Sequence, residues 1–398
     1  MGRLGHPQFR SIAHSFWTAN TRFGTFGSPL GLVLAQDGGE LRFRRLTATT
    51  SEVTVPYPAW AARPDGALCL PTALALADEI STFAGFALWD HRHRPGVSIS
   101  LSGQLVGHGL RLPRVEPGEQ LTFLTKRLRS GRTLGHAEIE VWRGGGGVAA
   151  SSELLLSGRH SKLMASPVRS LRLLEAVLGH PRVFPLTQLV LTSHFARKPV
   201  APFDVPTSRA EIFPELRRLG EADGTQAKGG GGAKGSGGAK GGEGGDGGGE
   251  GGEGGEGGEG GEGGESGEGG EGVAPLLSVP GGRAAQRYGA TLRPQWANVL
   301  GGLHGGAACM LLEQTAAASY RDALHAAPPP ARAMAVSLLS SLACDGDGRD
   351  VVLAAATAPL AAVGAGAFTL ATARDARKQA RALEAQIWWE PIKSGVTY

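Results

Sequence analysis

The stretch that decides the fold of this chain reads Asn298-Val299-Leu300-Gly301-Gly302-Leu303-His304-Gly305-Gly306. A polar amide, paired glycines and a histidine lead directly into an apolar run of good helix formers, which predicts a helix that begins at the glycines. Free N–H groups at a helix start favour negative charge, and glycine lets a substrate carbonyl approach the backbone closely. The stretch therefore predicts an oxyanion hole, a set of donors that face an oxygen becoming negative during a reaction.

The pattern N-x-x-G-x-x-H-G-G, with the acid Glu313 nine positions after His304, resembles the phenylacetyl-CoA-thioesterase-like branch of the hot-dog family. Its acyl-CoA thioesterase 13 type is the best match in this pattern. A lone His-Gly-Gly before a helix is common, whereas the whole arrangement with its acid is more specific. The resemblance covers roughly residues 40–165 and 276–390.

An unequal second copy of the same plan precedes this stretch. Residues 68–78 read as a helix start with Pro71 in the first turn, where proline is tolerated, and they end at Asp78. In each copy the acid is followed by a strand that carries a serine, Ser98 in the first and Ser337 in the second. The strands expected in the first copy span residues 95–102, 120–128, 134–142 and 149–157, and in the second residues 335–341.

The fold class that follows is α+β. Two hot-dog domains, each an antiparallel sheet wrapped around a central helix, are expected to form an intramolecular pseudodimer. A tract with 29 glycines in 49 residues, largely a Gly-Gly-Glu repeat, cannot offset its ordering entropy and is predicted to be a disordered tether. The expected parts are an N-terminal extension (1–39), hot-dog domain 1 (40–165), a connector with a short helix at 171–178 (166–223), the linker (224–272) and hot-dog domain 2 (273–398).

The resemblance implies that each site is shared between two hot-dog units, with the acid from one helix and the Asn and His-Gly-Gly from its partner. Here the first copy keeps an acid and a serine, but it has Cys69-Leu70-Pro71 at the His-Gly-Gly positions and Arg63 in place of Asn. Proline has no N–H to donate. The expected result is one composite site per pseudodimer, built from Asp78 and Ser98 of the first copy with Asn298, His304, Gly305 and Gly306 of the second.

The resemblance also implies the roles. Asp78 would act as general base, or as nucleophile, and Ser98 would help to hold the water. The Gly305 N–H and the Asn298 side chain would face the thioester oxygen, His304 would orient the turn, and Gly306 would let the substrate approach. Cations at a strand end suit the phosphates of coenzyme A, which gives substrate-binding roles to Arg159, His160 and Lys162. Thioester hydrolysis needs no metal and no cofactor beyond the coenzyme A of the substrate.

Plainer interpretations stand beside these roles. Asp78 could be an ordinary exposed acid, although its apolar neighbours favour a half-buried one, and Gly305 and Gly306 could serve only the packing of a helix on a sheet. The run from Arg159 to Lys162 could be a solvated strand end. Glu313 reads as structural, and whether it forms a second weak site with Ser337 is left open.

The function expected is therefore that of an acyl-CoA thioesterase, which releases a free acid and coenzyme A. One alternative is a non-catalytic acyl-CoA or acyl-carrier binding protein, because the loss of one half-site per copy is what drift toward binding would produce. Another is a hydroxyacyl dehydratase, which shares the fold and also pairs a histidine with an acid. The length and head group of the acyl chain depend on a pocket that the sequence does not give.

Composition agrees with a soluble globular chain, since 41% of the residues are hydrophobic and 19% are charged. The net charge of +4 hides an acidic linker. Residues 224–272 hold ten acidic and three basic side chains, which leaves 37 basic against 26 acidic ones, about +11, elsewhere. The arginines are scattered, so a solvated surface or an anionic small ligand such as coenzyme A is expected rather than nucleic acid. Three distant cysteines indicate neither a disulfide framework nor a zinc site.

The ends of the chain raise two further questions. The first 36 residues lack Asp and Glu but include Arg3, Arg10 and Arg22, a composition typical of an organelle transit peptide. Mitochondrial import is the expectation, with a plastid or the cytoplasm as alternatives. Residues 351–373 carry no charge, but their Ala, Gly and Thr content favours two buried strands joined by a turn over a membrane span. Self-association beyond the pseudodimer is left open.

Overall fold

The structure is a computed structural model of the chain. It describes residues 6–22, 26, 30–32, 35, 38–107, 111–148, 152–164, 177, 180, 182–190, 216–219, 285–298, 301–344, 349–360, 366–376 and 380–390. The predicted Gly-Gly-Glu linker lies outside the described residues. So does the helix expected at residues 171–178, apart from Val177, which is helical.

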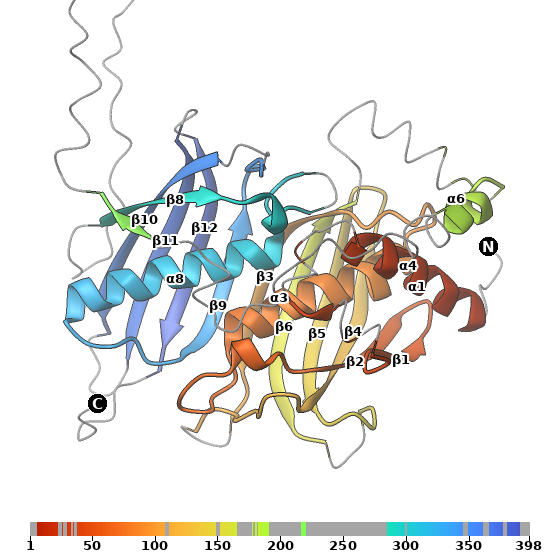
Figure 1. Ribbon diagram of the computed structural model, residues 1–398, viewed down its shortest axis with the longest axis horizontal. Coiled ribbons are helices and arrows are strands. Elements are labelled where there is room, and N and C mark those ends of the chain that lie inside the picture. The colour runs from red at the N-terminus through yellow and green to blue at the C-terminus, as the bar shows by residue number, and fades with distance from the viewer. Residues whose placement is uncertain are drawn as a thin grey trace, which may run out of the picture. The chain divides into compact units, whose positions relative to one another are not determined.

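One antiparallel sheet of twelve strands forms the scaffold (Figure 1). Its strand order is β1-β2-β4-β5-β6-β3-β9-β12-β11-β10-β8-β7. The first half of the chain supplies β1 (Arg42–Leu46), β2 (Thr50–Pro56), β3 (Val97–Leu105), β4 (Gln120–Ser130), β5 (Leu134–Arg143) and β6 (Leu154–Leu163). The second half supplies β7 (Arg217–Arg218), β8 (Gln286–Leu292), β9 (Ala331–Leu338), β10 (Arg349–Pro359), β11 (Ala367–Asp375) and β12 (Arg381–Trp389).

The two halves of the sheet meet where β3 pairs with β9. This ladder is antiparallel, and Ser100 faces Ser337 while Gln104 faces Ala333. Because a strand's side chains alternate between its two faces, this register fixes which residues of the two halves can come together. The first half therefore continues into the second without a break in the sheet.

Two long helices lie against the sheet, α3 (Leu70–Ser81) on the first half and α8 (Gly305–Leu324) on the second (Figure 1). They also pack on each other. All twelve residues of α3 are buried, which explains why it is a nearly continuous run of apolar and small residues with Pro71 in its first turn. A large antiparallel sheet with so few helices is consistent with the hot-dog fold.

Further helical elements complete the described part of the chain. A π-helix, η2 (Thr82–Phe86), follows α3 directly and passes into α4 (Ala87–Trp89). Single π turns within helices occur mostly at functional sites, and this one follows directly after Asp78 and its turn. The remaining helices are α1 (His6–Arg22), η1 (Ala59–Ala61), α6 (Phe184–Val190) and η5 (Pro294–Trp296).

The uncharged run at residues 351–373 forms a hairpin. β10 and β11 pair from Val351↔Asp375 to Pro359↔Ala367, as two buried strands joined by a turn should. No helix among the described residues is long and apolar enough to cross a membrane. Of the expected strands, 149–157 is displaced, because β6 begins only at Leu154 and extends to Leu163.

The N-terminal extension packs on the first half of the chain. Ile12 and Trp17 of helix α1 are buried. The indole ring of Trp17 lies edge-on to the rings of Phe43 and Phe83, with centroid-to-centroid distances of 6.1 and 6.5 Å. Phe26 further along is fully buried as well. A segment expected to be a separable leader thus contributes to the hydrophobic core. Import into an organelle stays a prediction from composition.

Replacing Trp17 with alanine tests this packing. Because the indole is 1% exposed, we expect Trp17→Ala to lower the free energy of unfolding by about 3–5 kcal/mol. Arg10→Ala, which removes an exposed side chain of the same helix, should cost about 1 kcal/mol or less. Chemical denaturation measures both. Equal, small effects would mean that α1 does not pack on the first half in solution.

Candidate active site

A buried carboxylate joins the two halves of the chain. Asp78 lies in the last turn of α3 with an exposed fraction of 0%, and its Oδ2 accepts a hydrogen bond from the backbone N–H of Gly306 at 2.8 Å. Its Oδ1 accepts one from the hydroxyl of Ser98 on β3, also at 2.8 Å. The acid and serine of the first half therefore meet the glycine turn of the second half, as the sequence suggested that they should.

The surroundings of Asp78 keep it ionised. Burial alone would raise the pKa of this carboxyl, but His304, His160, Lys162 and the Ser98 hydroxyl together hold it well below its usual range. Charged neighbours and hydrogen bonds to the carboxylate favour the charged form. Asp78 is therefore an anion at neutral pH, fixed by donors from both halves.

His160 faces inward from β6 and is fully buried. Its Nε2 lies 3.0 Å from the Ser98 Oγ and 3.1 Å from the Asp78 Oδ1, and its Nδ1 lies 2.7 Å from the Ser81 Oγ. Burial lowers the pKa of His160 to about 3, against the attraction of Asp78. The ring is thus neutral at pH 7, and with Nε2 donating to Asp78 its Nδ1 accepts from the Ser81 hydroxyl.

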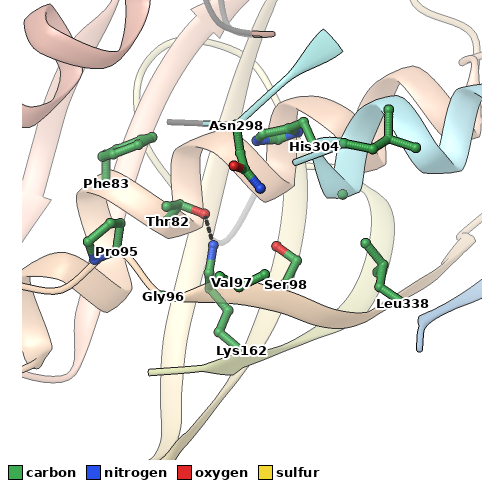
Figure 2. Close-up of a pocket in the computed structure, with 12 residues that line it drawn as sticks. Thr82, Phe83, Pro95, Gly96, Val97, Ser98, Lys162, Asn298, His304 and Leu338 are labelled. Atoms are coloured by element: carbon green, nitrogen blue, oxygen red, sulfur yellow. Dashed lines mark hydrogen bonds between the residues drawn. The ribbon is translucent and has the colours of Figure 1, made fainter. Parts of the chain in front are cut away.

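Lys162 lies two residues further along β6, on the same face. Its Nζ donates to the Thr82 Oγ1 at 2.6 Å, and Thr82 donates in turn to the backbone oxygen of Asp78 (Figure 2). Burial lowers the pKa of Lys162, while Asp78 and Glu79 raise it. The net result is a lowered pKa, because the effect of burial exceeds that of the two nearby carboxylates.

Strand β6 places the cations expected to meet the phosphates of coenzyme A in different surroundings. The exposed fractions of His160 and Lys162 are 0% and 3%; the His160 ring contacts Asp78, and the Lys162 amine contacts the Thr82 hydroxyl. Arg159, on the opposite face of β6, is exposed, as strand alternation requires, whereas Lys162 lines the cavity described below. The sequence showed that 160 and 162 share a face, but it did not show which face.

The loop before α8 is held by several backbone hydrogen bonds. The N–H of His304 donates to the Trp296 oxygen at 2.9 Å, and the N–H of Asn298 donates to the Gly302 oxygen at 2.7 Å. Gly301 makes the turn with a φ of +78°, which favours glycine. These bonds place the Asn298 side chain beside His304 at the mouth of the helix (Figure 2).

His304 caps the start of α8. Its Nδ1 accepts from the Gly306 N–H at 3.0 Å and lies 3.2 Å from the Asp78 Oδ2. Its Nε2 lies 3.2 Å from the Glu79 Oε1. The Gly306 N–H is thus shared between the histidine and the aspartate, while the Gly305 N–H is one of the helix-start donors that no intrahelical carbonyl accepts. Glu79, a buried neighbour of Asp78, had been given no role.

A small cavity opens among these groups. It has a volume of about 30 Å³, enough for a water molecule but not for an acyl chain. Both halves of the chain line it, and its lining includes polar and apolar side chains. The lining residues are Thr82, Phe83, Pro95, Gly96, Val97, Ser98, Lys162, Asn298, Leu303, His304, Gly305 and Leu338 (Figure 2).

The residues that would form a second site, at the start of α3 and at Glu313 and Ser337, have other surroundings. The backbone N–H of Cys69, at the start of α3, donates to the Tyr57 hydroxyl at 3.1 Å, and Arg63 bonds to Asp65. Glu313 is buried, whereas Ser337 is exposed. Among the residues that the structure describes, no group of three His, Cys, Asp or Glu side chains is arranged to hold a metal ion.

Comparison with known proteins gives a mixed result. No protein-family model matches the chain, and no curated protein matches it. Among solved structures, it is similar to the tesB protein of Mycobacterium avium subspecies paratuberculosis (12% identity, 91% of this chain and 99% of that one, TM-score 0.47). Others are the 12:0-ACP thioesterase of Umbellularia californica (9%, 86% and 94%, 0.44) and zebrafish thioesterase superfamily member 2 (22%, 31% and 81%, 0.26).

Gly305→Ala tests how tightly the two halves meet. An added Cβ would lie 2.6 Å from the Asp78 Oδ2 and 2.9 Å from the Ser98 Cβ, closer than such atoms approach. We expect this overpacking to lower the free energy of unfolding by about 1–3 kcal/mol. Gly146→Ala, where an added Cβ meets nothing within 4 Å, should change it by about 0.5 kcal/mol or less. If the two variants unfold alike, Gly305 is not in contact with Asp78.

The neutral His160 makes stability depend on pH. Its pKa is about 3 when folded and 6.5 ordinarily, so between these values the unfolded chain binds an extra proton and stability falls as pH falls. Asp78, whose pKa is lowered from 3.8, loses its contribution only in more acidic solution. Between about pH 4 and 6.5, His160→Gln should flatten the slope of unfolding free energy by up to about 1.4 kcal/mol per pH unit. Denaturant unfolding of the wild-type and variant proteins across this pH range measures the slope, and an unchanged slope in His160→Gln would contradict a buried neutral ring.

The candidate site combines residues from both halves of the chain. The chain is similar to solved structures that are named as thioesterases, which agrees with the resemblance stated from the sequence.

Proposed function

We propose that this chain is an acyl-CoA thioesterase with one composite active site between two fused hot-dog domains. In this proposal residues 40–165 and 273–398 form the domains, and their pairing is the pseudodimer. The observation that carries it is the 2.8 Å hydrogen bond from the Gly306 N–H to the Asp78 Oδ2, which joins the acid of one domain to the glycine turn of the other.

The reaction assigned to the site is hydrolysis of a thioester by water. A water molecule in the cavity beside Ser98 attacks the thioester carbon, and its proton passes to the Asp78 carboxylate. The carbonyl oxygen becomes negative and is stabilised by the Gly305 N–H and the Asn298 side chain. Collapse of the intermediate breaks the carbon–sulfur bond, and the coenzyme A thiolate takes up the proton.

The other residues of the site act on Asp78 and His304 rather than on the substrate. His160 and Ser98 orient the Asp78 carboxylate, and Lys162 offsets its charge in a site that excludes bulk water. The cavity holds a water molecule but not an acyl chain, so substrate entry requires side chains such as Phe83 or Leu338 to move. Arg159 is the exposed cation closest in sequence to these groups, and it is assigned to the coenzyme A phosphates.

A non-catalytic acyl-CoA binding protein is the competing function. The difference between the two halves of the chain favours this function. At the start of α3 the backbone N–H of Cys69 already donates to the Tyr57 hydroxyl, and Ser337 of the second half is exposed. The competitor predicts binding of acyl-CoA without release of a thiol. Asp78 and its donors would then be a structural ion cluster only.

Variants on the two halves decide between these functions. In a thiol-release assay over acyl-CoA chain lengths, Asp78→Asn and Asn298→Ala should each lower kcat by about 10²–10³-fold, since each removes a group that acts in the transition state. Glu313→Gln, the matched change at the opposite acid, should stay within about 2-fold because a change away from the reacting atoms has little effect. A wild-type protein that binds acyl-CoA without thiol release, or a crippling Glu313→Gln, contradicts the proposal.

A further inference from the structure

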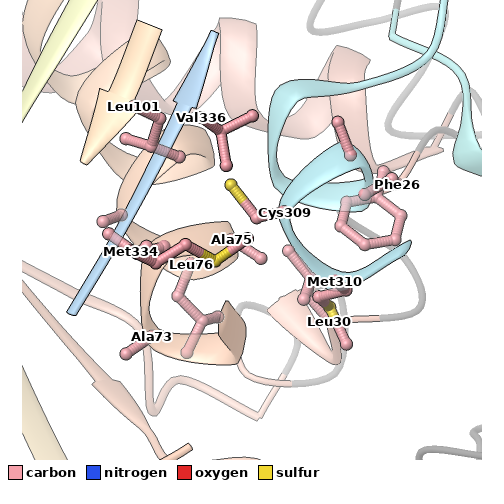
Figure 3. Packing of buried hydrophobic residues seen from close by; sticks show 14 of the residues in the cluster. Phe26, Leu30, Ala73, Ala75, Leu76, Leu101, Cys309, Met310, Met334 and Val336 are labelled. Carbon is pink, nitrogen blue, oxygen red and sulfur yellow. The ribbon is translucent and has the colours of Figure 1, made fainter. Parts of the chain in front are cut away.

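The N-terminal segment reaches the candidate active site. Phe26 is fully buried, and the centroid of its ring lies 5.4 Å from that of the His304 imidazole, with 32° between the planes. The backbone N–H of Phe26 donates to the Ala297 oxygen at 3.2 Å. Figure 3 shows Phe26 and Leu30 among the buried residues at the start of α8, with Met310.

The ring contact with His304 and the hydrogen bond to Ala297 lie at the two ends of the loop that precedes α8. Ala297 immediately precedes Asn298, and it also bridges to Leu303, just before His304. The hydrogen bond from Phe26 therefore holds the strand-like end of the loop, while its ring covers the imidazole at the helix end. Aromatic pairs at this separation and tilt are attractive.

The orientation of the His304 ring matters because both of its nitrogen atoms are engaged. Nδ1 faces the Gly306 N–H and Asp78, and Nε2 faces Glu79. Contacts at two edge atoms restrain the ring, but a rotation about the Cβ–Cγ bond would break both together. A side chain packed on the ring prevents that rotation.

We propose that Phe26 is a positioning residue of the active site, which fixes the His304 imidazole and the Asn298 loop from outside the two hot-dog domains. This inference rests on the proposed thioesterase function. Phe26 touches no reacting atom, and it acts through His304 and Ala297. The segment before the first strand is accordingly a third component of the site, and a protein cleaved after residue 26 would lack this component.

Phe26→Leu keeps an apolar side chain but removes the ring. We expect kcat to fall by about 10-fold with KM changed by less than about 3-fold, because small displacements of catalytic groups are costly. Leu30→Ala is the matched control, a buried change in the same segment without a ring on His304, and it should leave kcat within about 2-fold. Phe26→Tyr, which keeps the ring, should restore most of the lost kcat.

Two readouts separate positioning from general destabilisation. In a double-mutant cycle, Phe26→Leu should have no further effect once His304→Gln is present, whereas independent structural effects would add. The imidazole ¹⁵N signals of His304 should shift or broaden in Phe26→Leu and stay unchanged in Leu30→Ala. Additive effects, or equal changes in the two variants, would overturn the proposal.

The two proposals fail in different ways. If the wild-type protein releases no thiol from any acyl-CoA, the proposed function fails. The ¹⁵N signals of His304 then decide the role of Phe26 by themselves, because they report the ring's environment without catalysis. Unchanged signals in Phe26→Leu would show that Phe26 does not fix the ring.

Discussion

The structure depends on the close approach of the end of α3 to the start of α8. An ionised carboxylate costs several kcal/mol to bury unless donors replace its water, and Asp78 finds them in Ser98 and in the Gly306 N–H. This approach needs glycine at the start of α8, because a Cβ on Gly306 would lie 2.7 Å from the Ala75 Cα. The β3–β9 ladder sets the register that brings these helix ends together.

Burial makes the charges of this site interdependent. Asp78 and Glu79 are adjacent on one helix and almost fully buried, and both raise the pKa of the buried Lys162 amine against the effect of its burial. His160 is neutral and supplies a dipole instead of a charge. Removing one member of such a set leaves its partner as an uncompensated charge, which is more destabilising than never having buried the pair. A substitution among these buried groups therefore changes both the free energy of unfolding and the charge state of the site.

The sequence predicted the parts of the fold and site that local pattern controls. The helix begins at Gly305, the uncharged run forms the β10–β11 hairpin, and Asp78 meets the glycine turn of the other half. Alternation put His160 and Lys162 on one face, but only the packed sheet decides that this face is the inner one. Net charge suggested a leader in the N-terminal extension, although the spacing of Phe9, Ile12, Ala13 and Trp17 was a signal of a helix with one buried face.

Under the proposed function, fusion of two hot-dog units into one chain explains why the two halves differ. In a symmetric pair of identical subunits, any substitution changes both sites at once, so both must be kept. In a fused chain the start of α3 is free to become packing surface. Pro71 and Leu70 are buried there, and Tyr57 has taken the Cys69 N–H that a substrate oxygen would otherwise need. The loss of N–H donors at the start of α3 does not affect the donors at the start of α8. The site at α8 can also use a side chain such as Phe26, which occurs only once in the chain and needs no equivalent at a second site.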